Sequence, residues 1–213
     1  MKTVQDQGID GADTIRITGG QIKENNFVAK SGQLINGWQI TTSFINPGST
    51  ADIASFNIDI FIMDMSPELD REGDETGRLI IKGAIVQYGG KLDVLQFIVE
   101  NPDTVDYINS HWEVNNTVNV RGRIRVTSME EKPMPSSSSW GEDIPDTTRM
   151  IRELIITKGD DEGKEEEFAY DPVEIKKGFN VRKAYIEQLQ IDAKNKSNAS
   201  TANPSKYSNM SWE

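Results

Sequence analysis

Hydrophobic and polar residues alternate one by one over much of the middle of the chain, which is the pattern of a half-buried β-strand. In "ASFNIDIFIMDM" (54–65), phenylalanine and isoleucine alternate with asparagine and aspartate until the last few positions. In "TVNVRGRIRVTS" (117–128), valine and isoleucine alternate with asparagine and arginine. A shorter run, "RELIIT" (152–157), has the same character. Each of these segments therefore predicts a strand with one face toward a core.

Two further apolar runs, at 78–88 and 91–100, are separated by Gly89 and Gly90. Two glycines between strand-like runs favour a tight hairpin, because glycine adopts the positive φ angles that such turns need. Gly83 inside the first run predicts a bulge or a sharp bend.

Two segments change to the helical period. In 102–112, Asn101 can cap a helix of about three turns and Pro102 suits its first position. In 171–190, Asp171 is the cap of a longer amphipathic helix. Its apolar stripe consists of Ile175, Phe179, Ile186 and Leu189.

The order of elements in the middle of the chain is that of an OB-fold, a five-stranded Greek-key barrel with a helix between its third and fourth strands. We therefore predict a mainly β protein built on such a barrel, with extra N-terminal strands and a C-terminal amphipathic helix. The predicted barrel strands are 38–63 (in one piece or bent), 78–88, 92–100, 117–127 and 151–157.

The same pattern predicts how the chain is divided. A long acidic loop, rich in proline and serine, should connect the last two strands at 129–148. The predicted parts are a strand extension at 1–36, an OB domain at 37–160, a helix at 171–190 and a disordered tail at 191–213.

Composition restricts the chemistry. The chain of 213 residues has no cysteine, which excludes disulfides and thiolate nucleophiles, and its one histidine, His111, cannot form a histidine pair around a metal. No phosphate-binding loop or dinucleotide fingerprint is present, and no carboxylate pair stands out. An acidic loop containing Asp70 and Asp74 lacks the full calcium-loop pattern. We therefore expect no enzyme activity, no catalytic residues, no cofactor and no metal.

Net charge is −11, but the acidic excess is uneven. Residues 129–175 hold 14 acidic and 5 basic side chains, a net −9, whereas residues 176–213 hold 3 and 7, a net +4. The charge of the whole chain therefore argues only weakly against a polyanionic ligand. The first residues lack the apolar core of a signal peptide, and no apolar run reaches the roughly 20 residues that span a bilayer. The expected location is the bacterial cytoplasm, with no membrane partner.

The run "GRLIIKGAIVQYGGKLDVLQFIVENPDTVDYINSHWEVNNTVNVRGRI", followed by "RELIITKGD" and "DPVEIKKGFNVRKAYIEQL", resembles phage and prophage single-stranded DNA-binding proteins of the OB-fold type. The resemblance covers roughly residues 38–190. It implies a non-enzymatic role in phage DNA replication or recombination, in the host cytoplasm. Many bacterial single-strand binders recruit replication proteins through an acidic tail ending in Pro-Phe, whereas this chain ends in "SNMSWE".

Three arginines at every second position, Arg121, Arg123 and Arg125, form the most specific candidate site. On a strand they share one face at a spacing of about 7 Å, close to the repeat of a stretched nucleic-acid backbone. One interpretation is a stripe that follows phosphates. The other is a solvated face paired with neighbouring carboxylates, and the pattern alone does not decide between them. Lys82 and Lys91 flank the hairpin and would extend the stripe.

Aromatic side chains are the second requirement, because single-strand binders stack bases on aromatic rings. Phe61 and Phe97 lie off the best-alternating apolar faces of their strands, which leaves an outward position open to them, while Trp112 is expected in the core. Each candidate also fits an ordinary core position. The candidates for base stacking are Trp38, Phe44, Phe61, Tyr88, Phe97 and Trp140.

The sequence therefore predicts sequence-nonspecific binding of single-stranded DNA. The alternative is an OB-type structural or adaptor protein without a nucleic-acid role, such as a virion component. Replication or recombination proteins are the further partners that the first function would imply. The oligomeric state is left open.

Overall fold

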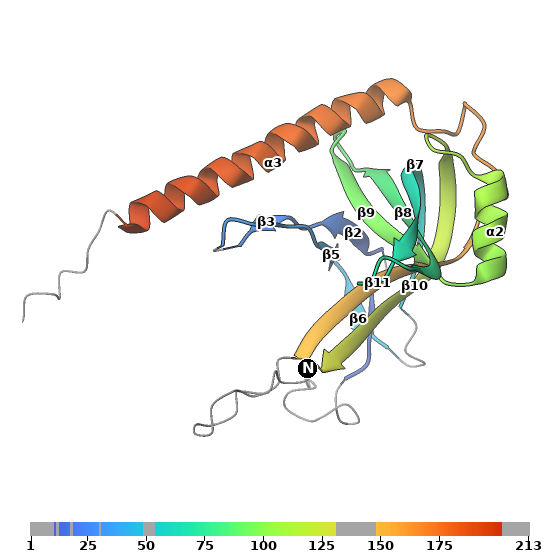
Figure 1. Cartoon of the computed structure of the whole chain (residues 1–213), viewed down its shortest axis with the longest axis horizontal. Coiled ribbons are helices and arrows are strands. Elements are labelled where there is room, and N and C mark those ends of the chain that lie inside the picture. Colours follow the sequence, from blue (N-terminus) through green and yellow to red (C-terminus); the bar gives the residue numbers. More distant parts are fainter. Residues whose placement is uncertain are drawn as a thin grey trace, which may run out of the picture. The chain divides into compact units, whose positions relative to one another are not determined.

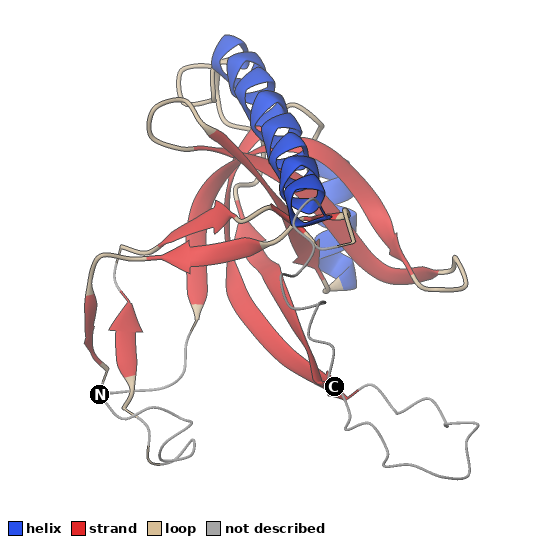
Figure 2. Ribbon diagram, turned by 90° about the vertical axis from the view of Figure 1, so that its left-hand side faces the viewer, coloured by secondary structure: helices blue, strands red, loops and turns tan. Residues whose placement is uncertain are grey.

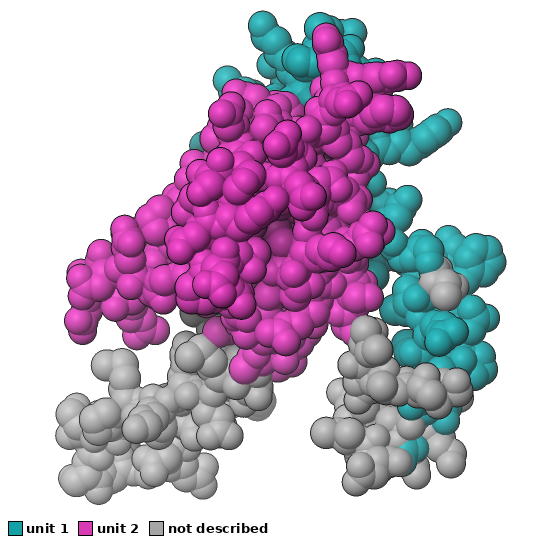
Figure 3. Space-filling model, turned by 90° about the vertical axis from the view of Figure 1, so that its right-hand side faces the viewer, with its two compact units in different colours: residues 1–50, 86–93, 171–213 teal, residues 51–85, 94–170 magenta. Residues whose placement is uncertain are grey.

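Five long strands close into a barrel in the computed structural model, which describes residues 11, 13–17, 19–29, 31–48, 54–130 and 148–201 (Figure 1). The chain divides into two compact units (Figure 3). A barrel unit consists of residues 51–85 and 94–170, and a second unit consists of residues 1–50, 86–93 and 171–213.

The barrel has the strand order β7-β8-β9-β11-β10, closed by pairing of β10 with β7. Among the barrel strand pairs whose register is described, β9 and β11 are parallel and the other pairs are antiparallel. The short helix α2 (Pro102–His111) connects β9 to β10. This order confirms the predicted OB-fold. The strands are β7 (Ser55–Leu69), β8 (Glu75–Val86), β9 (Leu92–Val99), β10 (Thr117–Glu130) and β11 (Thr148–Gly159).

The barrel core contains the apolar faces that alternation predicted for β7 and β10, together with residues that alternation did not place there. Phe97 lies at its centre, with its ring 5.7 Å from that of Phe56, and Gly83 leaves room for it. The register of β7 shifts next to the partner of Gly83, as predicted for a bulge. Other fully buried side chains are Ile60, Ile62, Ile81, Val99, Val118, Val120 and Leu154.

Helix α2 begins where its sequence predicts and ends at His111, one residue before the predicted end. The side chain of Asn101 accepts a hydrogen bond of 3.2 Å from the backbone N–H of Thr104, and Pro102 occupies the first turn. Trp112 follows the helix and is buried, with its Nε1–H donating to the carbonyl of Asp160 at 2.9 Å. The expected core position of Trp112 is therefore confirmed.

The first barrel strand differs from the expectation. It begins at Ser55, and residues 38–47 belong to the second unit, where they form parts of small two-stranded sheets. Pro47 and Gly48 end the earlier segment, so the two apolar runs cannot form one continuous strand. The N-terminal strands pair as β1 (Ile15–Ile17) with β6 (Ile45–Pro47), β2 (Gln21–Glu24) with β5 (Trp38–Thr41) and β3 (Phe27–Val28) with β4 (Leu34–Ile35).

The second unit also contains the glycine turn and the long helix α3 (Pro172–Thr201). Gly89 and Gly90 both have positive φ, which confirms the predicted tight turn. Asp171 accepts a hydrogen bond from the N–H of Val173 at 2.8 Å at the start of α3. The predicted stripe is the more buried side of the helix, and the helix continues to Thr201 instead of ending at 190.

Strands dominate the described part of the chain, which contains two helices, one short and one long (Figure 2). Neither of them, within the described residues, is long and apolar enough to cross a membrane. Most of the predicted acidic loop, residues 131–147, lies outside the described residues, as do residues 202–213 of the predicted tail.

Candidate nucleic-acid interface

The arginine row lies on β10, which is paired with β7 on one side and β11 on the other. Arg121 lies opposite Lys158, and Arg125 lies opposite Glu153. Gly122, between Arg121 and Arg123, is buried. The register of β10 and β11 shifts between Arg121 and Gly122. The strand therefore holds its arginines on the outward face, as alternation predicted, but each arginine meets a different neighbour.

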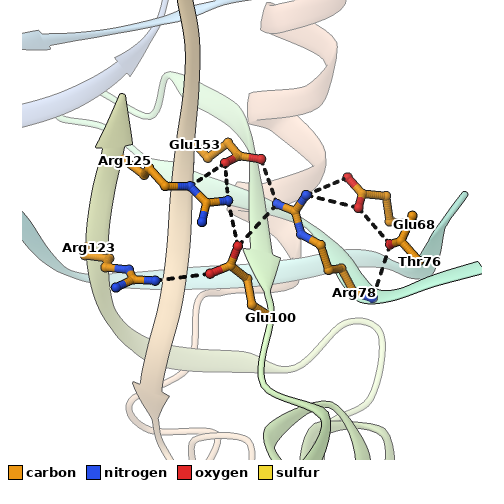
Figure 4. A network of polar contacts seen from close by, with 7 residues as sticks. All are labelled: Glu68, Thr76, Arg78, Glu100, Arg123, Arg125 and Glu153. Carbon is orange, nitrogen blue, oxygen red and sulfur yellow. Dashed lines mark hydrogen bonds and ion pairs between the residues drawn. The ribbon is translucent and has the colours of Figure 1, made fainter. Parts of the chain in front are cut away.

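Arg123 and Arg125 are paired with carboxylates (Figure 4). Arg125 donates two hydrogen bonds to Glu153, at 2.8 Å from Nε and 2.5 Å from Nη2. Its Nη2 also lies 2.6 Å from Glu100, which contacts Arg123 at 3.2 Å. For these two arginines the structure has the paired arrangement that was the alternative to a free phosphate stripe.

The network continues to β8 and β7 through Arg78, which was not among the candidate site residues predicted from the sequence. Arg78 donates to Glu153 at 2.7 Å and lies 3.1 Å from Glu68. The sequence places Arg78 and Lys82 on the same face of one strand, which is the pattern that could have identified Arg78 as a candidate. The partner of Arg78 is Glu153 on β11, 75 positions away in the sequence. Three arginines and three glutamates, from β7, β8, β10, β11 and the residue that follows β9, thus form one cluster with no net charge.

Burial and hydrogen bonding act in opposite directions on Glu153. Burial alone would raise the pKa of its carboxyl, but hydrogen bonds from Arg78 and Arg125 outweigh burial and lower the pKa below its ordinary value of 4.5. The hydrogen bond to Glu153 likewise raises the pKa of the Arg125 guanidinium. Both groups are therefore charged at neutral pH, and the cluster is an ion-pair network.

Arg121 and Lys158 differ from the rest of the row. Both side chains are exposed, and within the described residues neither forms an ion pair or side-chain hydrogen bond. Like charges directly opposite each other on antiparallel strands are unfavourable. This pair is therefore a place where a bound anion would lower the electrostatic energy.

The two predicted lysines are both paired. In the barrel unit, Lys82 lies 2.8 Å from Asp64 across the β7–β8 ladder. In the second unit, the ammonium of Lys91 lies 3.3 Å from Asp93 and 5.6 Å from the centre of the Tyr185 ring. Neither lysine extends the arginine row as an unpaired cation.

The aromatic candidates separate into buried and exposed rings. Of the two positions open to Phe61 and Phe97, the structure has the core one, because Phe97 is fully buried in the barrel and Phe61 is 8% exposed. Tyr88 at the hairpin turn is fully exposed, and Trp38 on β5 is half-buried. Trp140 lies outside the described residues.

Phe61 is covered because a later segment crosses the outer side of β7 and β10. The N–H of Lys164 donates to the carbonyl of Thr117 at 2.8 Å, and the N–H of Tyr170 donates to the Thr117 hydroxyl at 3.0 Å. The ammonium of Lys164 lies 2.8 Å from Asp59. Burial alone would raise the pKa of Asp59, but hydrogen bonds from Lys164 and Asn119 lower it.

A polar pocket of about 320 Å³ adjoins this later segment in the barrel unit, next to the only histidine of the chain. His111 uses Nδ1 in a contact of 2.8 Å with the carbonyl of Tyr107, and Glu113 and Lys164 line the same pocket. Among the described residues, no three histidine or carboxylate side chains form a cluster that could hold a metal. The Asp70 carboxylate instead accepts hydrogen bonds from the backbone of its own turn.

Comparison with known proteins gave one family match. The model of a family described as YorF matches residues 1–192. No curated protein is significantly similar to the chain in sequence.

Solved structures gave distant matches. Mitochondrial single-stranded DNA-binding protein Rim1 of S. cerevisiae is 11% identical, with 51% of this chain and 94% of that chain covered and a TM-score of 0.36. The Plasmodium falciparum SSB in complex with ssDNA is 15% identical, with coverages of 53% and 96% and a TM-score of 0.35. A deletion mutant of the single-stranded DNA-binding protein of Thermus aquaticus is 9% identical, with coverages of 75% and 91% and a TM-score of 0.37. TM-scores this low do not identify a function.

Proposed function

The chain belongs to the YorF family, and we propose that it binds single-stranded DNA on its OB barrel without strong sequence preference. The observation that carries this proposal is that Arg121 and Lys158 lie opposite each other and have no ion-pair partner among the described residues, whereas Arg123 and Arg125 are paired with carboxylates. A phosphate between them would remove their mutual repulsion and form charge-assisted hydrogen bonds.

Arg123 is the next cation along the strand. Its side chain is 60% exposed, and among the described residues its ion pair is with Glu100, at 3.2 Å. Exposed ion pairs of this kind contribute little to stability, so a phosphate can compete for the guanidinium at small cost. Arg121 and Arg123 lie about 7 Å apart on one face, a spacing that suits consecutive phosphates of an extended strand.

Base stacking on rings of the second unit would be a separate contribution to the affinity. Tyr88 and Phe44 are the exposed aromatic candidates of that unit within the described residues, and Trp38 is half-buried. An aromatic side chain that stacks on a base contributes about 1–3 kcal/mol regardless of which base it is. Phosphate contacts together with stacking would give binding that depends on salt and little on sequence.

The biological setting is part of the same proposal. We propose a role in phage DNA replication or recombination in a bacterial cell, with proteins of that machinery as further partners. Neither an enzymatic step nor a cofactor is needed for this role.

The experiment is a titration of dye-labelled oligo(dT) with the full-length protein, followed by fluorescence anisotropy at 50 and 200 mM salt. Each phosphate contact on a single strand contributes a slope of about 0.7 in log Kd against log salt. Three contacts would therefore raise Kd by about twentyfold over this range. A flat titration at micromolar protein in low salt would falsify the proposal.

Charge reversal tests the location. Replacing both Arg121 and Lys158 by glutamate should weaken binding by at least about tenfold and reduce the salt slope by about 1.4. The matched control is K176E/K177E, which makes the same charge change at exposed positions of α3. Equal losses in the two variants would show that net charge, and not this pair, controls binding.

A second function is favoured by a specific observation. Arg123 and Arg125 are neutralised by Glu100 and Glu153 within the protein, as expected for the wall of a structural or adaptor module. For that function, oligo(dT) should not bind at either salt concentration. The triple variant R121A/R123A/R125A should then change stability alone.

A further inference from the structure

Glu100 occupies an unusual position at the end of β9. Its carboxylate lies 2.6 Å from Arg125, 3.2 Å from Arg123 and 3.8 Å from Arg78 (Figure 4). One carboxylate therefore contacts all three guanidiniums of the cluster. Its side chain is 26% exposed, so the group is reachable from solvent.

Glu153 makes a different kind of contact. Its side chain is only 13% exposed, and it accepts hydrogen bonds of 2.7 Å from Arg78 and of 2.8 and 2.5 Å from Arg125. The cluster thus has an inner part, in which Glu153 holds two arginines, and an outer part, in which Glu100 neutralises Arg123. If Glu100 moved away, Arg78 and Arg125 would still be held in place by Glu153.

We infer that Glu100 is an internal competitor of phosphate that sets the affinity of this face for single-stranded DNA. The inference rests on the proposed function. A carboxylate and a phosphate offer a guanidinium the same pair of acceptor oxygens, so each can take the place of the other. DNA binding would exchange Glu100 for a backbone phosphate on Arg123, while Arg125 stays paired with Glu153. The released carboxylate would be hydrated because it is already partly exposed.

This exchange would also select for polyanions. A single free anion must compete with a carboxylate that is tethered beside the arginines and therefore has a high effective concentration. A nucleic-acid strand can be held first by Arg121 and Lys158, which have no carboxylate partner among the described residues. The next phosphate of the bound strand is then also tethered beside Arg123, so it competes with Glu100 at a comparable effective concentration.

The test replaces Glu100 by glutamine, which keeps the shape and removes the charge. E100Q should bind oligo(dT) about tenfold more tightly than the wild type at 50 mM salt, which corresponds to about 1.4 kcal/mol. Its salt slope should be steeper by about 0.7 for each additional phosphate contact. The matched control is E113Q, which removes the same charge from an exposed position of the barrel unit.

A second variant identifies the route. If Glu100 acts by occupying Arg123, the gain from E100Q should fall to about the level of E113Q when R123A is added. A gain in E100Q no larger than in E113Q, or a gain that persists in R123A/E100Q, would overturn the inference. In both of these cases the wild type still binds DNA, whereas failure of the proposed function would appear as no binding by the wild type and E100Q alike.

Folding is checked separately by thermal denaturation of each variant. If E100Q does not fold, E100D replaces it, because the shorter side chain keeps the charge but reaches the guanidinium of Arg123 less well. E100D should then bind more tightly than the wild type. Unchanged or weaker binding by folded E100D would overturn the inference.

Discussion

Gly122 interrupts the arginine row for a steric reason, which predicts a large effect of G122A. A Cβ atom at this position would lie 1.9 Å from the carbonyl oxygen of Ile155 and 2.5 Å from the ring of Phe56. Non-bonded carbon–oxygen contacts are about 3.3 Å or longer, so β10 and β11 would have to separate locally by more than about 1 Å. Overpacking costs about 1–3 kcal/mol and each disrupted ladder hydrogen bond about 1 kcal/mol more. We expect G122A to lose about 3 kcal/mol or more of unfolding free energy.

The measurement is urea denaturation followed by circular dichroism, with the unfolding free energy extrapolated to water. The matched control is G77A on β8, where φ is +80° and no atom lies within 4 Å of the added Cβ. That variant should lose only the cost of a left-handed alanine, about 1–2 kcal/mol. If G122A is as stable as G77A, the close approach of β10 and β11 at Gly122 does not exist.

Three further predictions concern stability. N101A should lose about 1 kcal/mol in urea denaturation, because the N-cap hydrogen bond to the backbone of Thr104 disappears. W112F should lose about 2 kcal/mol, because the carbonyl of Asp160 loses its donor and the smaller ring leaves a void. E153Q should lose about 2 kcal/mol at pH 7. The pKa of Glu153 is lower in the folded protein, so its stabilisation is full above the ordinary value of 4.5 and is lost as the pH falls through the folded-state pKa. The stabilities of wild type and E153Q, measured from pH 7 downward, should therefore converge in acid.

Each of these has an outcome that would contradict it. N101D should retain the stability that N101A loses, since aspartate also caps a helix. A W112F protein as stable as the wild type would mean that the indole hydrogen bond contributes nothing. A constant difference between E153Q and the wild type at all pH values would show that the charge of Glu153 has no role in stability.

Local patterns were sufficient for the elements of the barrel. The apolar pattern predicted β8, β9, β10 and β11 with ends that differ from the observed ends by about three residues or fewer. Asn101 and Pro102 predicted the start of α2. Gly89 and Gly90 located the hairpin. These features depend on residues close together in sequence, and the order of the elements then leaves few topologies other than an OB-fold.

Burial on both faces of a strand is the reason why the outward position considered for Phe61 and Phe97 does not hold. On β9, Phe97, Ile98 and Val99 are all buried, and on β7 the same holds for Phe61 and its two neighbours. Alternation assumes that one face meets solvent, and it fails where another part of the chain covers that face. The segment that covers Phe61 lies about a hundred positions later, and nothing near Phe61 in the sequence announces it.

The sequence by itself determined that the arginines of β10 share one outward face, because the period of a strand is a local property of the backbone. Only the tertiary structure decided which of them are neutralised. Arg125 meets Glu153, and Arg123 meets Glu100, over separations of 28 and 23 positions in a chain with 34 acidic residues. Ion pairing depends on distances of a few ångströms between side chains of different strands, and strand register and barrel closure set those distances. The same closure leaves Arg121 beside Lys158 without a carboxylate among the described residues.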